Sequence, residues 1–337
     1  MRLRAVGIPS VHGGEDVKVS IIIPTFNRSA LVVNAIESAL QQTHPNCEII
    51  VVDDGSTDDT VEMLAPYLDR IRYFHQNNQG VAAALNKGIE AACGRWIAIL
   101  ASDDLWMPTK LESQFRAIAE LGEEFGACFT DCSYVGNPAL TLSAFEKAQL
   151  ECPSECGPLG SPQKYVLARH PALYVQSMLI LRSLLQKVNR FDQQLLVGED
   201  TDLLFRLTFH TRFCVVRAPL VKIDRAPFRP RLADLYTSRS DPAFACIEYR
   251  YNKWLGLPEL TDPRTRRTLQ QSMQWLYYDW TVARLYKSDF AGALGKIRQL
   301  RKTGHSFLRI VVTLLFRAAR KLLSALAGKE GRMPLEH

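Results

Sequence analysis

The chain has 337 residues, of which 47% are hydrophobic, and this suits one large folded domain or two smaller ones. Its formal charge of +6 is mild for a nucleic-acid binder and suits an anionic cofactor or an anionic membrane surface. No secretory signal and no apolar run long enough to span a bilayer is visible, so we expect a cytoplasmic protein whose eight cysteines are mostly reduced thiols.

Strand-like and helical patterns alternate along the first hundred residues. Apolar runs rich in β-branched residues predict strands that are buried on both faces, and the segments between them have helical spacing. We expect strands at 19–25, 47–52, 71–74 and 96–100, and helices at 30–41, 57–68 and 81–92. This alternation predicts a mostly parallel α/β sheet flanked by helices, in which a ligand binds beyond the carboxyl ends of the strands.

The pattern continues less regularly and then changes character. Further strands are expected at 125–134, 173–181 and 213–221, a helix at 201–209, and a loop over the site at 136–163. Beyond about Pro230, long helical patterns dominate. We therefore predict an N-terminal extension at 1–17, an α/β catalytic domain at 18–228 and a helical C-terminal region at 229–337.

Paired aspartates follow two of the predicted strands: Asp53 and Asp54 form the first acid pair, and Asp103 and Asp104 form the second. Adjacent carboxylates repel each other unless a cation neutralises them, so the second pair could hold Mg²⁺ or Mn²⁺ with phosphate oxygens completing the shell. The first pair could accept hydrogen bonds from a base or from ribose hydroxyls. Either pair alone is typical of a turn before a helix, but two such strand ends in one α/β unit favour a nucleoside-diphosphate site.

Five sequence blocks resemble the family 2 glycosyltransferases of the GT-A fold. They occur in the order VSIIIPTFNR at 19–28, EIIVVDDGSTDDT at 48–60, NQGVAAALNKGI at 78–89, GRWIAILASDDLW at 94–106 and FDQQLLVGEDTDLLFRL at 191–207. The resemblance extends over roughly residues 18 to 225. It implies an inverting transferase that takes a sugar from a nucleoside-diphosphate sugar, with a uridine diphosphate sugar as the default.

The resemblance also implies roles for individual residues. The residues that would bind the donor nucleotide are Pro24, Thr25, Asn27, Arg28, Asp53, Asp54, Asn86, Lys87, Ser102 and Asp103. Asp103 matches the last acid of the family's Asp-x-Asp metal motif, and Asp104 follows it as a second candidate ligand for Mg²⁺ or Mn²⁺. Asp200, paired with Glu199 at the head of a helix, matches the catalytic base.

Three positions depart from the family pattern. Ala101 stands where the first acid of the metal motif often lies, so the metal shell is expected to be thin. Leu85 stands where an arginine often precedes the asparagine, and Lys87 or Arg28 could supply the missing charge. Many relatives carry a metal-binding histidine on a later strand, and here that role is unfilled or passes to Asp224.

The resemblance implies a single-displacement mechanism, against which other functions can be compared. Asp200 would take the proton of an acceptor hydroxyl as that oxygen attacks the anomeric carbon, although the Glu199-Asp200 pair equally suits a helix start with Thr201. Residues 24–28 lack the Gly-x-Gly-x-x-Gly of a dinucleotide-dependent oxidoreductase. A nucleotidyltransferase, or a catalytically weak relative that binds nucleotide sugars, remains the alternative.

The tail suggests where the chain works. Over 305–327 no helix breaker occurs, and at about 100° per residue four basic side chains gather opposite an apolar side. Such a helix could lie in the headgroup interface at the inner face of an anionic membrane. Alternatively, it packs against the rest of the protein. We expect a saccharide or a lipid-linked glycan as the acceptor, in cell-envelope or exopolysaccharide synthesis, and no nucleic-acid partner.

Overall fold

The computed structural model describes residues 17–122, 124–152, 154–168, 170–226, 240–303 and 311–313. They form two compact units. The larger unit consists of the residues up to 193 together with 199–226, and the smaller one of 194–198 together with the described residues from 240 onward. The predicted N-terminal extension and the tail helix at 305–327 lie outside the described residues, apart from Val17 and the helical triplet 311–313.

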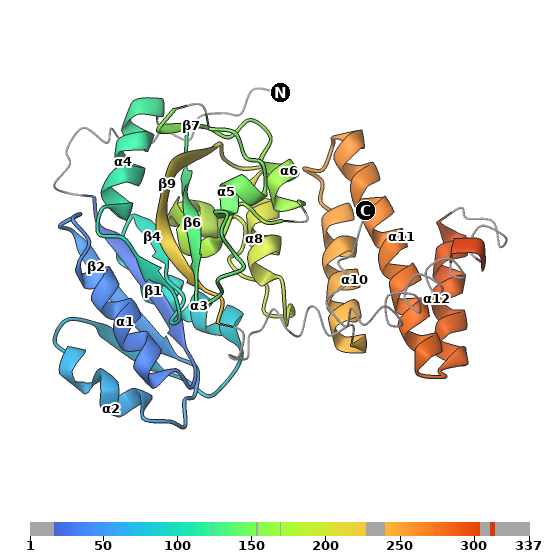
Figure 1. Cartoon of the computed structure of the whole chain (residues 1–337), viewed down its shortest axis with the longest axis horizontal. Coiled ribbons are helices and arrows are strands. Elements are labelled where there is room, and N and C mark those ends of the chain that lie inside the picture. The colour runs from blue at the N-terminus through green and yellow to red at the C-terminus, as the bar shows by residue number, and fades with distance from the viewer. Residues whose placement is uncertain are drawn as a thin grey trace. The chain divides into compact units, whose positions relative to one another are not determined.

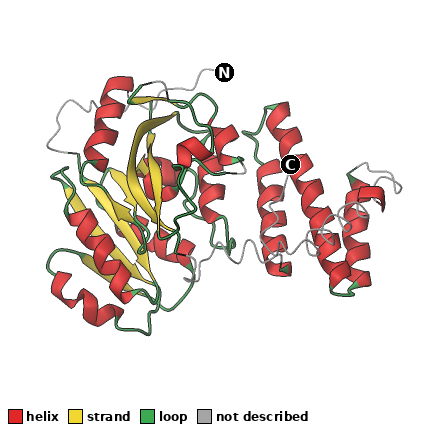
Figure 2. Cartoon of the chain, viewed as in Figure 1, coloured by secondary structure: helices red, strands yellow, loops and turns green. Residues whose placement is uncertain are grey.

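The larger unit is built on one mixed sheet (Figures 1 and 2). Its strands are β1 (Val19–Thr25), β2 (Cys47–Asp53), β3 (Arg72–His75), β4 (Trp96–Ile99), β5 (Leu105–Trp106), β6 (Ala127–Val135), β7 (Cys156–Pro158), β8 (Met178–Leu181) and β9 (Phe213–Asp224). The spatial order is β3-β2-β1-β4-β8-β6-β9-β5, with β7 also paired to β9. This is the α/β architecture expected for a GT-A fold.

Strand direction decides where the chemistry gathers. The strands β1 to β4 are parallel, β8 is antiparallel to both β4 and β6, and β9 is parallel to β6. Two reversals in succession make β6 and β9 point the same way as β1 to β4. The carboxyl ends of these six strands therefore share one side of the sheet, which we call the strand-end edge.

Helices cover both faces of the sheet because side chains alternate along its strands. The helical elements of this unit are α1 (Ser29–Leu40), α2 (Thr60–Leu64), η1 (Ala65–Tyr67), α3 (Val81–Ala91), α4 (Lys110–Leu121), α5 (Ala144–Lys147), α6 (Pro162–Val166), η2 (Val175–Ser177), α7 (Arg182–Lys187) and α8 (Glu199–Leu207). Ile21 and Ile23 share a buried cluster with residues of α1 and α4. Ile22 points the other way, toward α3, where a Cβ on Gly88 would lie 2.4 Å from its Cγ2.

Most predicted elements are present, and the differences have local causes. The helix predicted at 57–68 is shorter, because Pro66 removes a backbone donor and a separate 3₁₀ turn replaces its last part. The predicted loop at 136–163 contains the short elements α5, β7 and α6. The strand predicted from residue 173 begins only at Met178. Elements of three to five residues show too few repeats for periodicity to reveal them.

The smaller unit is helical, as predicted for the C-terminal region. It contains α10 (Asp241–Leu255), α11 (Pro263–Tyr286) and α12 (Phe290–Lys302). The side chains of Ser240, Asp262 and Asp289 accept hydrogen bonds from backbone N–H groups in the first turns, so each helix has a standard N-cap. No helix within the described ranges combines the length and hydropathy needed to cross a membrane.

Candidate active site

The first strand ends of the sheet bring Thr25 and the first acid pair together. Thr25 lies opposite Asp53 in the register of β1 and β2, and the Asp54 N–H donates to the Thr25 carbonyl at 2.9 Å. Thr25 is 3% exposed, and its hydroxyl oxygen has no hydrogen-bond partner in the part of the chain that the structure describes. A buried polar atom of this kind is costly unless a ligand or water completes it.

Both carboxylates of the first acid pair hold loops. Asp53 accepts hydrogen bonds from the Ser56 N–H at 2.8 Å and from the Tyr73 hydroxyl at 2.9 Å. Burial, together with the Asp53 carboxylate, raises the pKa of Tyr73. Asp54 accepts from the Gln76 side chain at 2.7 Å and from two main-chain N–H groups, those of Gln79 at 2.9 Å and Gly80 at 2.8 Å.

The first acid pair therefore shapes the edge on which a nucleoside would lie. Its hydrogen bonds fix the loops after β2 and β3 and the start of α3. A carboxylate oxygen that accepts one hydrogen bond can accept another, so Asp53 and Asp54 can still bind a base or ribose. These contacts stay a prediction.

Asn27 ties the loop after β1 to the loop after β2. Its Oδ1 accepts from the Thr57 N–H at 2.8 Å, and its own N–H donates to the Ser56 hydroxyl at 2.9 Å. Its φ of 51° lies in the left-handed region, which asparagine tolerates better than most residues. The neighbouring Phe26 is 43% exposed, and Pro24 is half-buried. The exposure of this aromatic ring beside a strand end could not be read from a local sequence pattern.

Arg28 lies at the second acid pair and forms an ion pair with Asp103. The two side chains are 27% and 21% exposed, so both can be reached from solvent. Of the two cations predicted to supply the missing charge, Arg28 is thus placed at the acids. Lys87 instead donates to the carbonyl of His75 at 2.8 Å.

Asp104 faces inward, behind Asp103. It is 2% exposed, and its Oδ1 accepts a hydrogen bond from the Asp224 N–H at 2.9 Å. Burial, followed by repulsion from Asp103, raises the pKa of Asp104 to about 7, while a hydrogen bond from Gln176 and the charge of Arg225 act in the opposite direction. The end of β9 thus lies against the second acid pair, and a metal-binding role for Asp224 stays a prediction.

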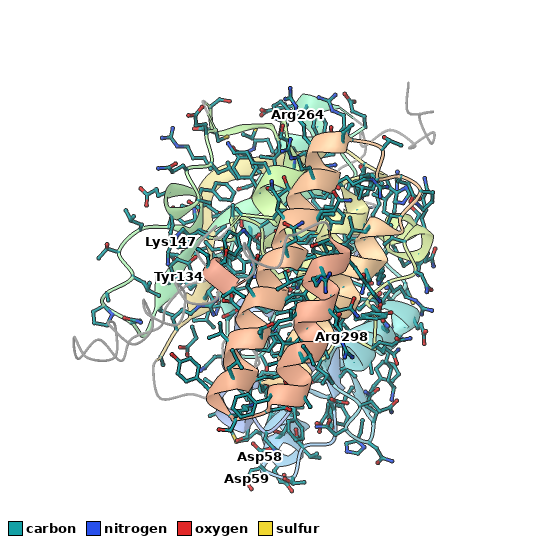
Figure 3. All side chains as sticks on the ribbon, turned by 90° about the vertical axis from the view of Figure 1, so that its right-hand side faces the viewer. Asp58, Asp59, Tyr134, Lys147, Arg264 and Arg298 are labelled. Atoms are coloured by element: carbon teal, nitrogen blue, oxygen red, sulfur yellow. The ribbon has the colours of Figure 1, made fainter. Side chains whose placement is uncertain are left out.

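A cationic and aromatic group continues the edge past Asp104. The Arg225 guanidinium carbon lies 5.7 Å from the ring centre of Tyr134 and 5.9 Å from that of Tyr174. The two tyrosine hydroxyl oxygens are 3.1 Å apart. Lys147 Nζ lies 5.9 Å from the Tyr134 ring centre, and both residues are labelled in Figure 3. No sequence motif pointed to these residues, and only the position of Arg225 beside Asp224 could have indicated one of them.

Few side chains at the strand-end edge could bind a metal ion. Within the described residues, no three His, Cys, Asp or Glu side chains lie close enough together to hold a metal ion. Mg²⁺ is commonly held by one or two carboxylates plus substrate phosphates. Asp103 fits that arrangement because its carboxylate is partly exposed, whereas one oxygen of Asp104 is already used by β9.

Two other predicted residues have structural partners. The Asn86 amide is buried and pairs with the main chain of Phe191, donating to its carbonyl at 2.9 Å and accepting from its N–H at 3.0 Å. This joins α3 to the segment that leads to α8. Ser102 is 5% exposed in the turn after β4. Contacts of either residue with the donor nucleotide stay predictions.

The helix α8 begins at Glu199 and carries Asp200 in its first turn. Asp200 Oδ1 accepts from the Thr201 N–H at 2.5 Å and from the Thr201 hydroxyl at 3.1 Å. Further along the helix, the buried carboxylate of Asp202 binds Arg206 at 2.6 Å, and Arg206 also donates to the Arg190 carbonyl at 2.8 Å. The helix is thus fixed from its second turn, while Asp200 lies half-buried at its start.

Comparison with known proteins finds similarity to one family in the first half of the chain. Residues 20–147 match the family model described as "Glycosyl transferase family 2". This part of the larger unit is therefore similar to glycosyltransferase family 2. A Rickettsia felis protein described as an uncharacterized glycosyltransferase is 49% identical over 121 residues, which is 35% of this chain and 19% of that protein. A second one, RP339 of Rickettsia prowazekii, is 33% identical over 192 residues, which is 56% of this chain and 58% of that protein.

Solved structures share the GT-A fold. S. aureus TarS 1–349 in complex with UDP-GlcNAc superimposes with a TM-score of 0.60 at 17% identity, covering 78% of this chain and 72% of that one. The mannosyltransferase PcManGT of Pyrobaculum calidifontis, in complex with GDP-Man and Mn²⁺, has a TM-score of 0.51 at 17% identity and covers 93% and 88%. At such identities the likeness shows the fold alone.

Proposed function

We propose that this chain transfers a sugar from a nucleoside-diphosphate sugar, with a UDP-sugar as the first choice, to a hydroxyl of a saccharide or lipid-linked glycan, inverting the anomeric centre. The observation that carries the proposal is the strand-end edge. There Thr25, with a buried hydroxyl that lacks a partner, lies beside one acid pair, and the second acid pair follows on the neighbouring strand β4. The family match and the UDP-GlcNAc complex of TarS support the same chemistry.

The donor nucleotide would lie along this edge. Its nucleoside would contact Thr25 and the loops that the first acid pair holds, with the exposed ring of Phe26 available for stacking on the base. Its diphosphate would then reach the second acid pair. Arg28 and Arg225 flank that pair, and guanidinium groups bind phosphate oxygens well.

Asp103 would hold a divalent ion together with the diphosphate, and Asp104 would support it from behind. When bound, such an ion offsets the charge that builds on the departing diphosphate. The Mn²⁺ complex of PcManGT makes a divalent ion a reasonable expectation for the fold. Arg28 would then exchange its carboxylate partner for a phosphate oxygen.

Asp200 would act as the base. Its carboxylate would take the proton from the acceptor hydroxyl while that oxygen forms a bond to the anomeric carbon and the bond to the diphosphate breaks on the opposite face. The hydrogen bonds that Thr201 donates to Asp200 orient the carboxylate and do not consume its capacity to accept a proton. Glu199 precedes it in the same first turn.

The acceptor would belong to cell-envelope or exopolysaccharide synthesis. A lipid-linked acceptor would place the enzyme at the inner face of a membrane. The chain spans 19% and 58% of the two Rickettsia proteins, so the activity of a whole protein of this kind is part of the proposal.

A ligand screen tests the proposal. Thermal unfolding would be followed with UDP, GDP, CDP, ADP and TDP, each with and without Mn²⁺, because a ligand that binds only the native state raises its stability. We expect one diphosphate to raise Tm more strongly in Mn²⁺, and we expect its sugar conjugate to release that nucleoside diphosphate in the presence of acceptor. Release of pyrophosphate would instead show a nucleotidyltransferase, and no stabilisation by any diphosphate would overturn the proposal.

A further inference from the structure

One side of α12, which we call its inner side, is buried in the helical unit. Ala293 and Leu300 are 1% and 0% exposed, and Ile297 packs on the same buried cluster. Lys296 lies on this side too, with its Nζ 3.1 Å from Glu248 and 3.3 Å from the ring centre of Trp280. These positions recur every three or four residues, as expected for the buried stripe of an amphipathic helix.

A neighbouring side of α12 presents two kinds of side chain to solvent. Near its start, Phe290 is 69% exposed and Leu294 is 49% exposed. Arg298 and Arg301 continue the same side of the helix at the next turns and are exposed. We call these four residues the outer face of α12, and Figure 3 shows Arg298 on the side turned to the viewer.

Apolar exposure continues on the end of α11 that precedes this helix. Leu285 is 40% exposed and Tyr286 is 52% exposed, and a short turn separates them from Phe290. Exposed apolar groups that cluster in this way and are bordered by polar ones are typical of a binding surface.

The charge around this face has one sign. From residue 290 to residue 329 the sequence contains no Asp or Glu and nine Lys or Arg residues. Arg298, Arg301 and Lys302 have no acidic partner within salt-bridge distance among the described residues. Their charge is therefore available to an anionic partner.

We propose that the outer face of α12 binds an anionic lipid bilayer, with Phe290 and Leu294 entering the headgroup region and Arg298 and Arg301 pairing with lipid phosphates. A flat interface rich in phosphate accommodates apolar and basic side chains side by side. The segment after α12 is a poorer occupant, because its own basic residues would lie against those of the helix. The contact would keep a transferase next to a lipid-linked acceptor, and it does not depend on which sugar is transferred.

Vesicle binding by the full-length protein tests the assignment with a matched pair of variants. Arg298→Gln/Arg301→Gln removes two basic residues from the outer face. Arg264→Gln/Arg267→Gln removes two exposed basic residues from the first turns of α11, and Arg264 is labelled in Figure 3. Co-sedimentation would use vesicles of phosphatidylglycerol with phosphatidylcholine, vesicles of phosphatidylcholine alone, and a duplex RNA as a competing polyanion.

We expect the α12 variant to bind anionic vesicles roughly 25-fold more weakly, at about fivefold for each basic residue, and the α11 variant to bind within twofold of wild type. Phe290→Ser/Leu294→Ser should weaken binding to both kinds of vesicle without lowering Tm, since both side chains are exposed. Binding by the α12 variant equal to wild type, or a preference of the wild type for RNA over vesicles, would overturn the proposal. Nucleoside diphosphate binding by the same variants should stay unchanged, which separates this outcome from a failure of the proposed transferase function.

Discussion

The first and second acid pairs differ in the groups that surround their carboxylates. Asp53 and Asp54 accept hydrogen bonds from loop N–H groups, an amide side chain and a tyrosine, all supplied by the segments just after β2 and in or just after β3. Asp103 instead pairs with Arg28, and Asp104 is buried against the end of β9 near Arg225. The first pair is completed by neutral groups of the scaffold, and the second depends on charges.

Because of this difference, we expect the first acid pair to stabilise the fold and the second to exchange its partners for a ligand. Hydrogen bonds from main-chain N–H groups stay in place whether or not a ligand is bound, so the first pair preorganises the edge. A surface ion pair such as Arg28–Asp103 contributes little stability and is easily exchanged for a phosphate or a metal ion. Substitutions in the first pair should therefore change folding, and substitutions in the second should change binding.

The largest effect should come from Asp200, which belongs to neither pair. Asp200→Asn keeps the shape of the side chain but cannot accept the proton, so we expect transfer to fall about a thousandfold or more. Affinity for the nucleoside diphosphate should stay within about twofold, because both acid pairs remain intact. Turnover assays and calorimetry on the same preparation measure the two quantities. A loss of affinity instead would show that Asp200 belongs to the donor site.

Asp54→Ala tests the scaffold role of the first pair. It removes the acceptor of three hydrogen bonds at the start of α3, and we expect the free energy of unfolding to fall by about 3 kcal/mol. Asp59→Ala is the control, because Asp59 is exposed and its side chain does not cap α2, so its effect should stay below about 0.5 kcal/mol. Urea unfolding measures both. Unchanged stability with lost nucleoside affinity would make Asp54 a direct ligand contact.

Lys110 is a buried basic residue whose protonation should make the stability of the larger unit depend on pH. It is fully buried on α4, with Nζ 2.9 Å from Gln114 Oε1 and 4.0 Å from the ring centre of Trp106. Gln114 in turn donates to the Ser177 carbonyl in η2, beside Gln176. Burial lowers the pKa of Lys110 to about 7.

The sign follows from proton binding in the two states. Between pH 7 and 9 the unfolded chain keeps the lysine proton and the native state loses it, so the contribution of Lys110 to stability should rise with pH by about 2 kcal/mol. Two other sets of groups oppose this trend: Asp104, whose pKa is raised to about 7, acts at the lower edge of the window, and buried thiols with raised pKa values act toward its upper edge. Because these groups are the same in both proteins, denaturant unfolding at pH 7, 8 and 9 should show the stability of wild type rising by about 2 kcal/mol relative to that of Lys110→Met. Parallel profiles would contradict the assignment.

Asp103→Ala should give the smallest of these effects in free energy. We expect affinity for the nucleoside diphosphate in Mn²⁺ to fall about tenfold, with nucleoside affinity and Tm nearly unchanged. Calorimetry with nucleoside, monophosphate and diphosphate, each with and without metal, resolves which part of the ligand is affected. Equal diphosphate affinity with and without metal in wild type would remove the metal from the proposal.

The elements nearest the site were visible in the sequence because their signals are local. The strand expected at 19–25 is β1 over the same residues, and the helix expected at 81–92 ends one residue earlier as α3. Apolar runs, helical periodicity and turn residues act within one element, so the alternation of strands and helices, and the acids after β2 and β4, follow from short stretches of chain.

The tertiary structure decided which distant groups meet. The reversed strand β8 turns β6 and β9 back to the direction of β1, and this brings Asp224 to Asp104, 120 residues apart. The same packing places Arg28 on Asp103 and joins Asn86 to Phe191, 105 residues away. Such pairings depend on strand order and on which face each side chain takes, and no local pattern encodes them. The sequence by itself therefore determined the α/β framework and its candidate acids. The folded sheet determined which of these carboxylates is paired with a cation and which one holds a loop.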